Sequence, residues 1–373
     1  NIGKALHVGH LRSLSIGRSL YRMNEVVGND VTSDIHLGDW GMPVAYIIAL
    51  IEKEDIKLEN LDYKDLEKIY PRAVAYSEEN KDFYELAKNI SVELNKGSNK
   101  YIKKWEKIST ISTKYIEENL SRLNHSFDLW RGESSVNSRI EPMIALLSEE
   151  NKILENQGAM VANIDVDPPI LITKSDGSYL YITTDLATVI QREEEGFDEI
   201  IYVVDNRQKK HFEQLFKCVE YFDLSKVTMK HISFGTINGK DGKPLKTRDG
   251  DVYKLDQLHK DIEEKLVSFE TPADSIDKLV NDILTYSDLL TNRNTDYKFD
   301  VEKFTDVQGK TAIYIEYAYV RGNKVIKDSS SMGWKKVNDP SNFQISNMIE
   351  RELVIELLKF KSYLDLSLIN NEP

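Results

Sequence analysis

Apolar residues recur at helical spacing close to the start of the chain. Within the opening residues, the stretch LRSLSIGRSLYRMNEVVG places apolar side chains three or four positions apart and ends at Gly28. This spacing is typical of a helix with one buried face, and a glycine just beyond it is a common C-terminal cap. The next segment, DVTSDIHLGDWG, predicts a strand that runs into a glycine-rich turn. A helix followed by a strand at this distance is half of a parallel α/β unit.

The middle of the chain has a different pattern. From about Tyr46 to Ala159 the residues Lys, Glu, Asn and Tyr dominate and the periodicity is helical, which predicts a helical insertion into the sheet. Strand-like runs return in PPILITKSDGSYLYITT, DEIIYVVD and TMKHISFGTI, with helices expected to begin near Asp185 and near His211. From about Leu255 onward the pattern is helical. We therefore predict an α/β fold, a Rossmann-like doubly wound parallel sheet with a helical insertion and C-terminal helices.

Composition narrows the class of protein. The 373 residues are enough for two or three domains. Basic residues number 49 and acidic residues 62, which excludes a generally basic surface that coats nucleic acid, so any nucleic acid must meet a local patch. The single cysteine, Cys218, excludes an internal disulfide and a multi-cysteine zinc site, and we expect it to be buried. No run approaches the ~18 to 20 apolar residues of a membrane span, so we expect a soluble cytoplasmic protein.

Two histidines form the first candidate site. Their spacing, His7 and His10, would place both rings on one face of a first helical turn that follows a strand, at the positive end of the helix dipole. Both rings could then donate to a phosphate. Gly9 lacks a side chain where a base or a phosphate needs close approach to the backbone. On these residues alone an alternative stays open, namely a pair of surface or capping histidines.

Two further segments favour the interpretation of the two histidines as a phosphate-binding site. GDWG, residues 38–41, follows the second predicted element, and GKDGKPLKTRDGD, residues 239–251, follows the last predicted strand. The second segment carries Lys243, Lys246 and Arg248 as cations that suit a polyphosphate. Its alternative interpretation is a solvated basic turn. Together the segments predict adenylyl transfer at the carboxyl ends of the strands of a doubly wound sheet.

Seven segments, in order, resemble those of class I aminoacyl-tRNA synthetases, and within that class the arginyl-tRNA synthetases. They are NIGKALHVGHLRS, HLGDWG, FDLWRGES, YLYITTDLA, YVVDNRQKKH, HISFGTINGKDGKPLKTRDGD and GKTAIYIEYAYVRGNKVI. The resemblance covers residues 1–327. It implies a monomer that uses L-arginine, ATP and tRNA(Arg), with Mg²⁺ bound through the polyphosphate of ATP. It also implies a separate N-terminal domain and a long C-terminal helical bundle, of which this sequence holds only the start of the bundle.

The resemblance implies two sets of binding residues. Positions matched to arginine binding are Asn1, Glu133, Tyr181, Asp185 and Gln208. A guanidinium group has five donors and stays charged, so carboxylates and a carbonyl acceptor suit it. Positions matched to ATP binding are His7, Gly9, His10, Gly38, Asp39, His211, Phe234, Gly235, Lys243, Lys246 and Arg248. The catalytic residues implied are Lys4, His7, His10 and Lys246.

Without the resemblance, several of these residues have simpler interpretations. Asp185 would be an N-terminal helix acid behind Thr183 and Thr184, Glu133 a turn residue, and His211 a residue at a helix N-terminus.

A stripe of side chains near the C-terminal end of the resemblance has two interpretations. Tyr314, Tyr317 and Arg321 share one helical face. The resemblance implies contact with the acceptor side of tRNA, whereas core packing is the alternative. Gly322 stands where the resemblance calls for a branched apolar residue.

The resemblance also implies a division of the chain into five segments. These are 1–45, the first half of the Rossmann catalytic domain; 46–159, a mainly helical connective insertion; 160–258, the second half with a closing loop; 259–339, a helical stem-contact region; and 340–373, the start of an anticodon-binding bundle.

The implied activity is arginine-tRNA ligation through an arginyl-adenylate. One alternative is a catalytically silent paralogue that binds arginine or a nucleotide. Another is a nucleotidyltransferase that acts on a small molecule. Arginine-dependent exchange of pyrophosphate into ATP, with and without tRNA, separates the three.

Overall fold

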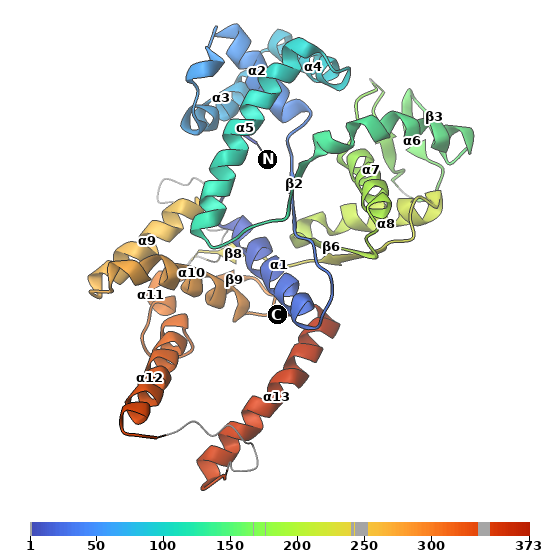
Figure 1. Ribbon diagram of the computed structural model, residues 1–373. Helices are drawn as coiled ribbons and strands as arrows, with labels where there is room; N and C mark the ends of the chain where they lie inside the picture. The colour runs from blue at the N-terminus through green and yellow to red at the C-terminus, as the bar shows by residue number, and fades with distance from the viewer. Residues whose placement is uncertain (1, 167, 176, 240–241, 243–252, 335–343) are drawn as a thin grey trace. The chain divides into compact units, whose positions relative to one another are not determined.

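The computed structural model describes residues 2–166, 168–175, 177–239, 242, 253–334 and 344–373 (Figure 1). The chain forms two compact units. Unit 1 comprises residues 1–6 and 32–233, and unit 2 comprises residues 7–31 and 234–373. The predicted α/β class is confirmed, although helices predominate and the described strands form short separate sheets. No helix in the described part of the chain is long and apolar enough to cross a membrane.

One part of unit 1 is a group of helices. They are α2 (Met42–Lys53), the 3-10 turn η1 (Leu58–Asn60), α3 (Tyr63–Glu79), α4 (Lys81–Asn95) and α5 (Asn99–Arg122). Helix α2 is buried on most of its surface, and α3, α4 and α5 pack around it. Helices α3 and α4 begin at side-chain caps, since Asp62 forms a capping box with Asp65 before α3 and Asn80 accepts from the Phe83 N–H at α4.

Two parallel strand pairs lie in the other part of unit 1. Strand β1 (Asp34–Leu37) pairs with β2 (Leu129–Gly132), and β6 (Glu199–Val203) pairs with β7 (Thr228–Ile232). Parallel strands need long crossover connections. The helical group α2 to α5 connects the first pair, and the 3-10 turn η3 (Asn206–Gln208) with α8 (Lys209–Phe222) connects the second.

Between β2 and β6 in the sequence, the chain forms most of a second hydrophobic core. Its elements are η2 (Glu133–Val136), α6 (Asn137–Glu149), the antiparallel strands β3 (Ile153–Asn156), β4 (Ala159–Ala162) and β5 (Leu171–Thr173), and α7 (Tyr181–Glu194). Apolar residues of α6, α7 and α8 pack together in it. Cys218 on α8 is buried as predicted, and burial raises the pKa of its thiol to about 12.

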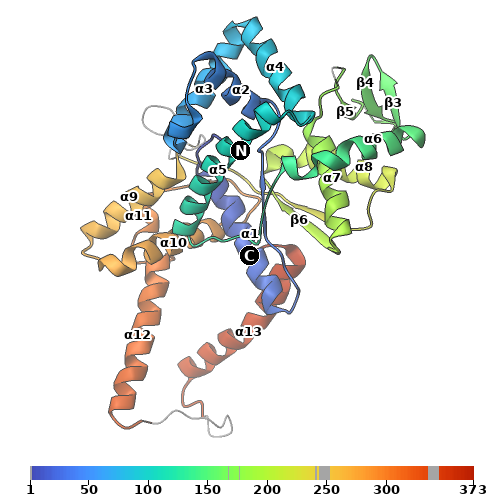
Figure 2. The ribbon, with the colours of Figure 1, turned by 45° about the horizontal axis from the view of Figure 1, so that its top comes forward.

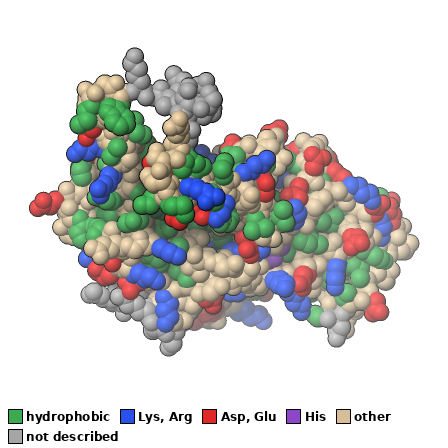
Figure 3. All heavy atoms as spheres, turned by 90° about the horizontal axis from the view of Figure 1, so that it is seen from below, with side chains coloured by type: hydrophobic (Ala, Val, Ile, Leu, Met, Phe, Trp, Pro, Cys, Tyr) green, Lys and Arg blue, Asp and Glu red, His purple; other side chains and the backbone are tan. Residues whose placement is uncertain are grey.

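Unit 2 is built around α1 (Gly9–Val26) and α10 (Ala273–Leu289). Its other elements are β8 (Ile237–Asn238), α9 (Leu255–Ser268), β9 (Tyr297–Lys298), α11 (Val301–Phe304), α12 (Ala312–Ser331) and α13 (Met348–Asn370). Helix α10 packs against α1, α9 and α12 (Figures 1 and 2). Most of α12 and α13 is exposed. On the face of the molecule seen in Figure 3, hydrophobic side chains lie on the surface among basic ones.

Several sequence predictions for elements are confirmed. Strand β1 ends at the glycine-rich turn, β6 and β7 match two of the strand-like runs, and α1 ends before Gly28, whose φ of 93° is a left-handed value that favours glycine.

Other sequence predictions for elements are wrong. The stretch 46–159 is helical through Arg122 but also contains β2, β3 and the first residue of β4. The run YLYITT begins helix α7 at Tyr181 instead of forming a strand before a helix near Asp185. The region beyond Leu255 contains the strand β9. His7 forms an isolated bridge and precedes α1, so it is outside the first helical turn, and no strand leads into that helix in the described residues.

Candidate functional site

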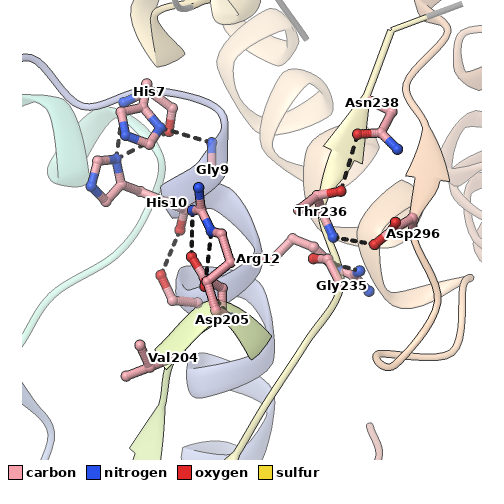
Figure 4. A network of polar contacts seen from close by, with 12 residues as sticks. His7, Gly9, His10, Arg12, Val204, Asp205, Gly235, Thr236, Asn238 and Asp296 are labelled. Atoms are coloured by element: carbon pink, nitrogen blue, oxygen red, sulfur yellow. Dashed lines mark hydrogen bonds and ion pairs between the residues drawn. The ribbon is translucent and has the colours of Figure 1, made fainter. Parts of the chain in front are cut away.

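The two histidines at the start of α1 lie side by side in unit 2. Their ring centroids are 4.0 Å apart, so the predicted grouping of the rings is confirmed. The His7 N–H donates to His10 Nδ1 at 3.0 Å, and the Gly9 N–H donates to His7 Nδ1 at 3.0 Å (Figure 4). Because His7 Nδ1 accepts from the backbone, the neutral His7 ring carries its hydrogen on Nε2. His10 Nδ1 lies near both the His7 N–H and, at 3.2 Å, the His7 carbonyl, so these contacts allow either tautomer of His10.

His10 is a neutral ring at physiological pH. Desolvation, followed by the nearby His7, lowers the pKa of His10 from 6.5 to about 3. A neutral ring can offer a ligand only an N–H donor or a nitrogen acceptor, and the positive potential at this place comes from the N-terminus of α1.

Gly9 is required by the position of the His7 ring. A Cβ atom at residue 9 would lie 2.8 Å from Cε1 and 2.9 Å from Nδ1 of His7. Any larger residue would therefore displace that ring and disturb the hydrogen bond that fixes its tautomer.

The backbone just beyond the lysine-rich segment joins the histidine segment. The Val8 N–H donates to the Tyr253 carbonyl at 3.0 Å, and His7 forms a bridge with Lys254. Lys243, Lys246 and Arg248 lie outside the described residues, as does Asn1. The described residues directly after the predicted closing loop therefore contact the histidine segment. The roles of the three cations of that loop stay predictions.

Gly235 lies where its own segment and the segment of residues 293–296 approach closely. A Cβ atom there would be 2.5 Å from Asp296 Oδ1 and 2.8 Å from the backbone of residues 295 and 296. The Gly235 N–H donates to the Arg293 carbonyl at 2.8 Å, and the next N–H, of Thr236, donates to Asp296 Oδ1 at 2.6 Å (Figure 4). Phe234 is buried beside it. Only glycine fits this position without a shift of the backbone.

Unit 1 contains a group of three carboxylates, Asp39, Glu133 and Asp185. Asp39 follows β1 and Glu133 follows β2 directly. Because Leu37 pairs with Gly132 in parallel register, both carboxylates leave the same edge of the strand pair. The charges of Asp185 and Asp39 both act on Glu133, which places the third carboxylate near the other two.

Asp39 holds the turn that carries Glu133. Its side chain is 4% exposed, and it accepts from the Ser134 N–H at 3.0 Å and from the Ser134 hydroxyl at 2.7 Å. A Cβ atom on Gly132 would lie 2.2 Å from the Asp39 carboxyl carbon. The Asp39 carbonyl accepts from Trp105 Nε1 at 2.6 Å. Gly132 and Ser134 were not singled out in the sequence, although both belong to the segment WRGES.

Glu133 is poised to bind a cation. The pKa of its carboxyl is raised from 4.5 to about 7. Desolvation is the largest cause, and the charges of Asp185 and then of Asp39 contribute to the same rise. A positively charged ligand would offset all three effects. Perturbation by burial and by like charges is common in binding and catalytic sites.

Tyr181 and Asp185 both lie on α7, one turn apart. Asp185 Oδ2 is 2.6 Å from Nε2 of His211 in the first turn of α8. No acidic residue occupies the first turn of α7, so the interpretation of Asp185 as a helix-start acid is wrong. Tyr181 is 63% exposed, and burial of part of its ring, with the charge of Glu133, raises the pKa of its hydroxyl.

The remaining predicted residues of unit 1 lie in different surroundings. Gln208 is exposed at the end of η3. Lys4 is exposed, with Nζ 4.6 Å from the centroid of the Tyr70 ring. The carbonyl of Gly38 accepts from the Ile2 N–H at 3.2 Å, so it anchors the first residues of the chain.

The tyrosine stripe on α12 is on the surface. Tyr314 is 52% exposed and Tyr317 is 57% exposed, and Arg321 Nη1 donates to the Tyr317 hydroxyl at 3.2 Å. The alternative of core packing is therefore wrong. A Cβ atom on Gly322 would meet nothing within 4 Å, so close packing does not explain this glycine.

In the described part of the chain, no group of three or more His, Cys, Asp or Glu side chains is arranged to hold a metal ion.

Comparison with known proteins gives a consistent result. The family model "tRNA synthetases class I (R), catalytic domain" matches residues 1–301. An arginine-tRNA ligase of Alkaliphilus oremlandii is 34% identical over 405 residues, covering 100% of this chain and 69% of the relative. One of Francisella tularensis is also 34% identical, covering 100% of this chain and 68% of the relative.

Solved structures agree in fold. The arginyl-tRNA synthetase of Plasmodium falciparum superposes with a TM-score of 0.80 at 26% identity, covering 99% of this chain and 64% of that one. The arginyl-tRNA synthetase of Thermus thermophilus superposes with a TM-score of 0.75 at 18% identity, covering 100% of this chain and 70% of that one.

Proposed function

The chain belongs to the arginyl-tRNA synthetases of class I, and we propose that it activates L-arginine with ATP and transfers the arginyl group to the 3′-terminal ribose of tRNA(Arg). The observation that supports this activity most directly is the carboxylate group of unit 1, in which desolvation, followed by the charges of Asp185 and Asp39, raises the pKa of Glu133 to about 7. Such a group favours a ligand with a permanent positive charge.

The proposed arginine site uses residues of unit 1. Glu133 and Asp185 would accept from the guanidinium group, and His211 would keep the Asp185 carboxylate in place through its 2.6 Å contact. Tyr181, one turn before Asp185, would line the same site. Asn1 and Gln208 complete the set by resemblance.

The proposed ATP residues include the histidine segment of unit 2. His7 would donate from Nε2, and His10 from an imidazole N–H, to the phosphates at the N-terminus of α1, beside Gly9. The remaining residues of this set are Gly38, Asp39, His211, Phe234, Gly235, Lys243, Lys246 and Arg248. Mg²⁺ enters with ATP as part of the substrate.

The proposed reaction has two steps. A carboxylate oxygen of arginine attacks the α-phosphorus of ATP, and pyrophosphate leaves with the electron pair of the broken P–O bond. A hydroxyl of the terminal ribose of tRNA then attacks the arginyl carbonyl, loses its proton, and AMP leaves. Lys4, Lys246 and the two histidines would stabilise the charge that develops on the phosphates. No enzyme side chain forms a covalent bond.

We also propose the finer organisation. The parallel pairs β1–β2 and β6–β7 would belong to one Rossmann-like doubly wound sheet, split into segments 1–45 and 160–258 by the insertion 46–159. The region 259–339 would contact the tRNA stem through the exposed stripe on α12, and 340–373 would begin the anticodon-binding bundle. The protein would act as a monomer in the cytoplasm.

The test measures charging of tRNA(Arg) with radiolabelled arginine, together with arginine-dependent exchange of pyrophosphate into ATP, with and without tRNA. Charging supports the proposal. Binding of arginine and ATP without exchange or charging, even with tRNA present, would overturn it in favour of a silent paralogue. Exchange that depends on a different acceptor would overturn it in favour of another nucleotidyltransferase.

A further inference from the structure

We infer that Arg12 is a positioning residue for ATP, because its buried guanidinium group ties the histidine-bearing helix α1 to the Gly235 segment and to α10. This inference rests on the proposed function, which assigns Gly235 and the α1 histidines to ATP. All the groups involved belong to unit 2.

Arg12 lies inside unit 2 instead of on its surface. The side chain is 1% exposed, and Nε lies 3.1 Å from Oδ1 of Asp288 on α10, which is itself fully buried. Burial raises the pKa of Asp288 to about 6 despite the adjacent guanidinium. A buried ion pair is expensive to form, so simple stability is a weak reason for a protein to contain one.

The other end of the guanidinium group binds backbone. Nη1 donates to the carbonyls of Gly235 at 3.1 Å and Thr295 at 2.8 Å. One nitrogen therefore spans the two segments whose close approach makes glycine necessary at residue 235. The guanidinium carbon also lies 5.2 Å from the centroid of the Tyr297 ring.

The geometry calls for an arginine. A planar fork can contact Asp288 through Nε while Nη1 reaches two carbonyls, whereas a lysine offers a single ammonium that cannot reach both ends in this way. Arg12 is two residues beyond His10 on α1, so its attachments set where the start of α1 stands relative to Gly235. A small displacement of a binding group is enough to reduce a reaction rate strongly.

The test compares Arg12→Lys with Arg22→Lys, an exposed arginine of the same helix that serves as the matched control. We expect Arg12→Lys to weaken binding of MgATP about tenfold and to lower kcat/KM for ATP at least as much. Binding of L-arginine, which is assigned to unit 1, should change less than about twofold, since the sites are assigned to separate residues. Arg22→Lys should leave both unchanged.

A second variant covers the case in which Arg12→Lys does not fold. Asp288→Asn keeps the shape of the partner but removes its charge, so the guanidinium loses its anchor and ATP binding should weaken while arginine binding is retained. Isothermal titration with MgATP and with L-arginine, below the melting temperature of each variant, gives the separate readouts.

The outcomes are distinct. If both variants melt at lower temperature but bind MgATP within about twofold of the wild type, Arg12 is only a structural anchor and the inference is wrong. If ATP and arginine binding fall equally, the inference is also wrong. If the wild-type protein charges tRNA normally in those cases, the proposed function stands. If the wild-type protein binds no MgATP, the proposed function fails and the inference fails with it.

Discussion

At the scale of single residues, His10 of the HVGH segment is a neutral ring that can offer a ligand N–H groups but no positive charge. The pKa of His10 is about 3, so this ring stays neutral throughout the physiological range. The backbone donor at Nδ1 of His7 leaves the hydrogen of that ring, when neutral, on Nε2, whereas His10 Nδ1 lies near both a backbone N–H and a backbone carbonyl. The arrangement therefore depends on the orientation of the rings, and Gly9 sets the orientation of one of them.

Gly9→Ala tests this dependence. The new methyl group would lie within 2.9 Å of the His7 ring, which must turn away. We expect the rate of arginine-dependent pyrophosphate exchange to fall about tenfold or more, because a misplaced donor no longer meets the phosphate. Gly9 has no positive φ and only the end of one side chain must move, so the melting temperature should change little. Equal exchange rates in the variant and the wild type would contradict this account of the ring.

Glu133 predicts a pH dependence of arginine binding. Its carboxyl has a pKa of about 7 in the free protein and must be ionised to pair with a guanidinium group. Arginine affinity should therefore rise about tenfold per pH unit below pH 7 and level off above it, with uptake of arginine accompanied by release of a proton. Titration calorimetry in buffers of different ionisation enthalpy measures both effects.

Glu133→Gln is the control for that titration. It should reduce affinity at pH 7.5 and flatten the pH profile between pH 5.5 and 7.5. Linkage gives a second readout: because folding raises this pKa from 4.5, the wild-type free energy of unfolding should fall relative to that of the variant as pH rises from 4.5 to 7. A variant that keeps the wild-type profile would show that another group is responsible.

At the scale of elements, the pair β1–β2 positions the carboxylates. The parallel register brings Asp39 and Glu133 to one edge, and two hydrogen bonds from Ser134 fix the turn between β2 and η2. Asp39 thus has an observed role in holding the Glu133 turn, whereas its contact with ATP stays a prediction.

Gly132→Ala would disturb this edge. The methyl group would overlap the buried Asp39 carboxyl, so either β2 must move from β1 or the Ser134 hydrogen bonds must break. We expect a loss of about 1–3 kcal/mol in the free energy of unfolding and weaker arginine binding. Gly322→Ala is the matched control, since open space surrounds that residue on α12 and the same change there should not destabilise the protein. Equal stability of Gly132→Ala and wild type in urea titrations would contradict the account.

The sequence predicts elements well where the pattern is long or the turn is distinctive. Helix α1 and strand β6 follow their hydrophobic patterns. The run YLYITT was assigned to a strand because its residues are aromatic and β-branched. Its environment determines a helix instead: Leu180 N–H donates to the Thr183 hydroxyl, which donates in turn to the Ile172 carbonyl of β5. Such contacts follow from tertiary structure and have no signature in a short window of sequence.

The sequence also predicts some residues of the candidate site and not others. The pairing of His7 with His10 follows from their spacing, and Glu133 and Asp185 were identified through family motifs. The supporting residues could not be found because their contacts join distant parts of the chain: Asp39 and Ser134 are 95 residues apart, and Arg12 and Gly235 are 223 apart. For Gly132 the only local signal is its place before Glu133.

At the scale of the whole molecule, residues with assigned roles come from both units. The chain passes between units at residues 6–7, 31–32 and 233–234, so Lys4 belongs to unit 1 and His7 to unit 2 although only two residues separate them. The residues assigned to arginine binding belong to unit 1, while the histidine segment and Gly235 belong to unit 2. Substitutions in the histidine segment or at Gly235 should therefore affect ATP binding more than arginine binding, and substitutions of Glu133 should do the reverse.

The central claim is that the carboxylates of unit 1 recognise a guanidinium group. Titration of the protein with L-arginine and with L-citrulline, its uncharged analogue of nearly the same shape, tests this claim directly in the presence of MgATP and tRNA(Arg). We expect arginine to bind on the order of 100-fold more tightly, because citrulline would leave the partly buried carboxylates of Glu133 and Asp185 without a cation. Equal affinity for the two amino acids would contradict the account.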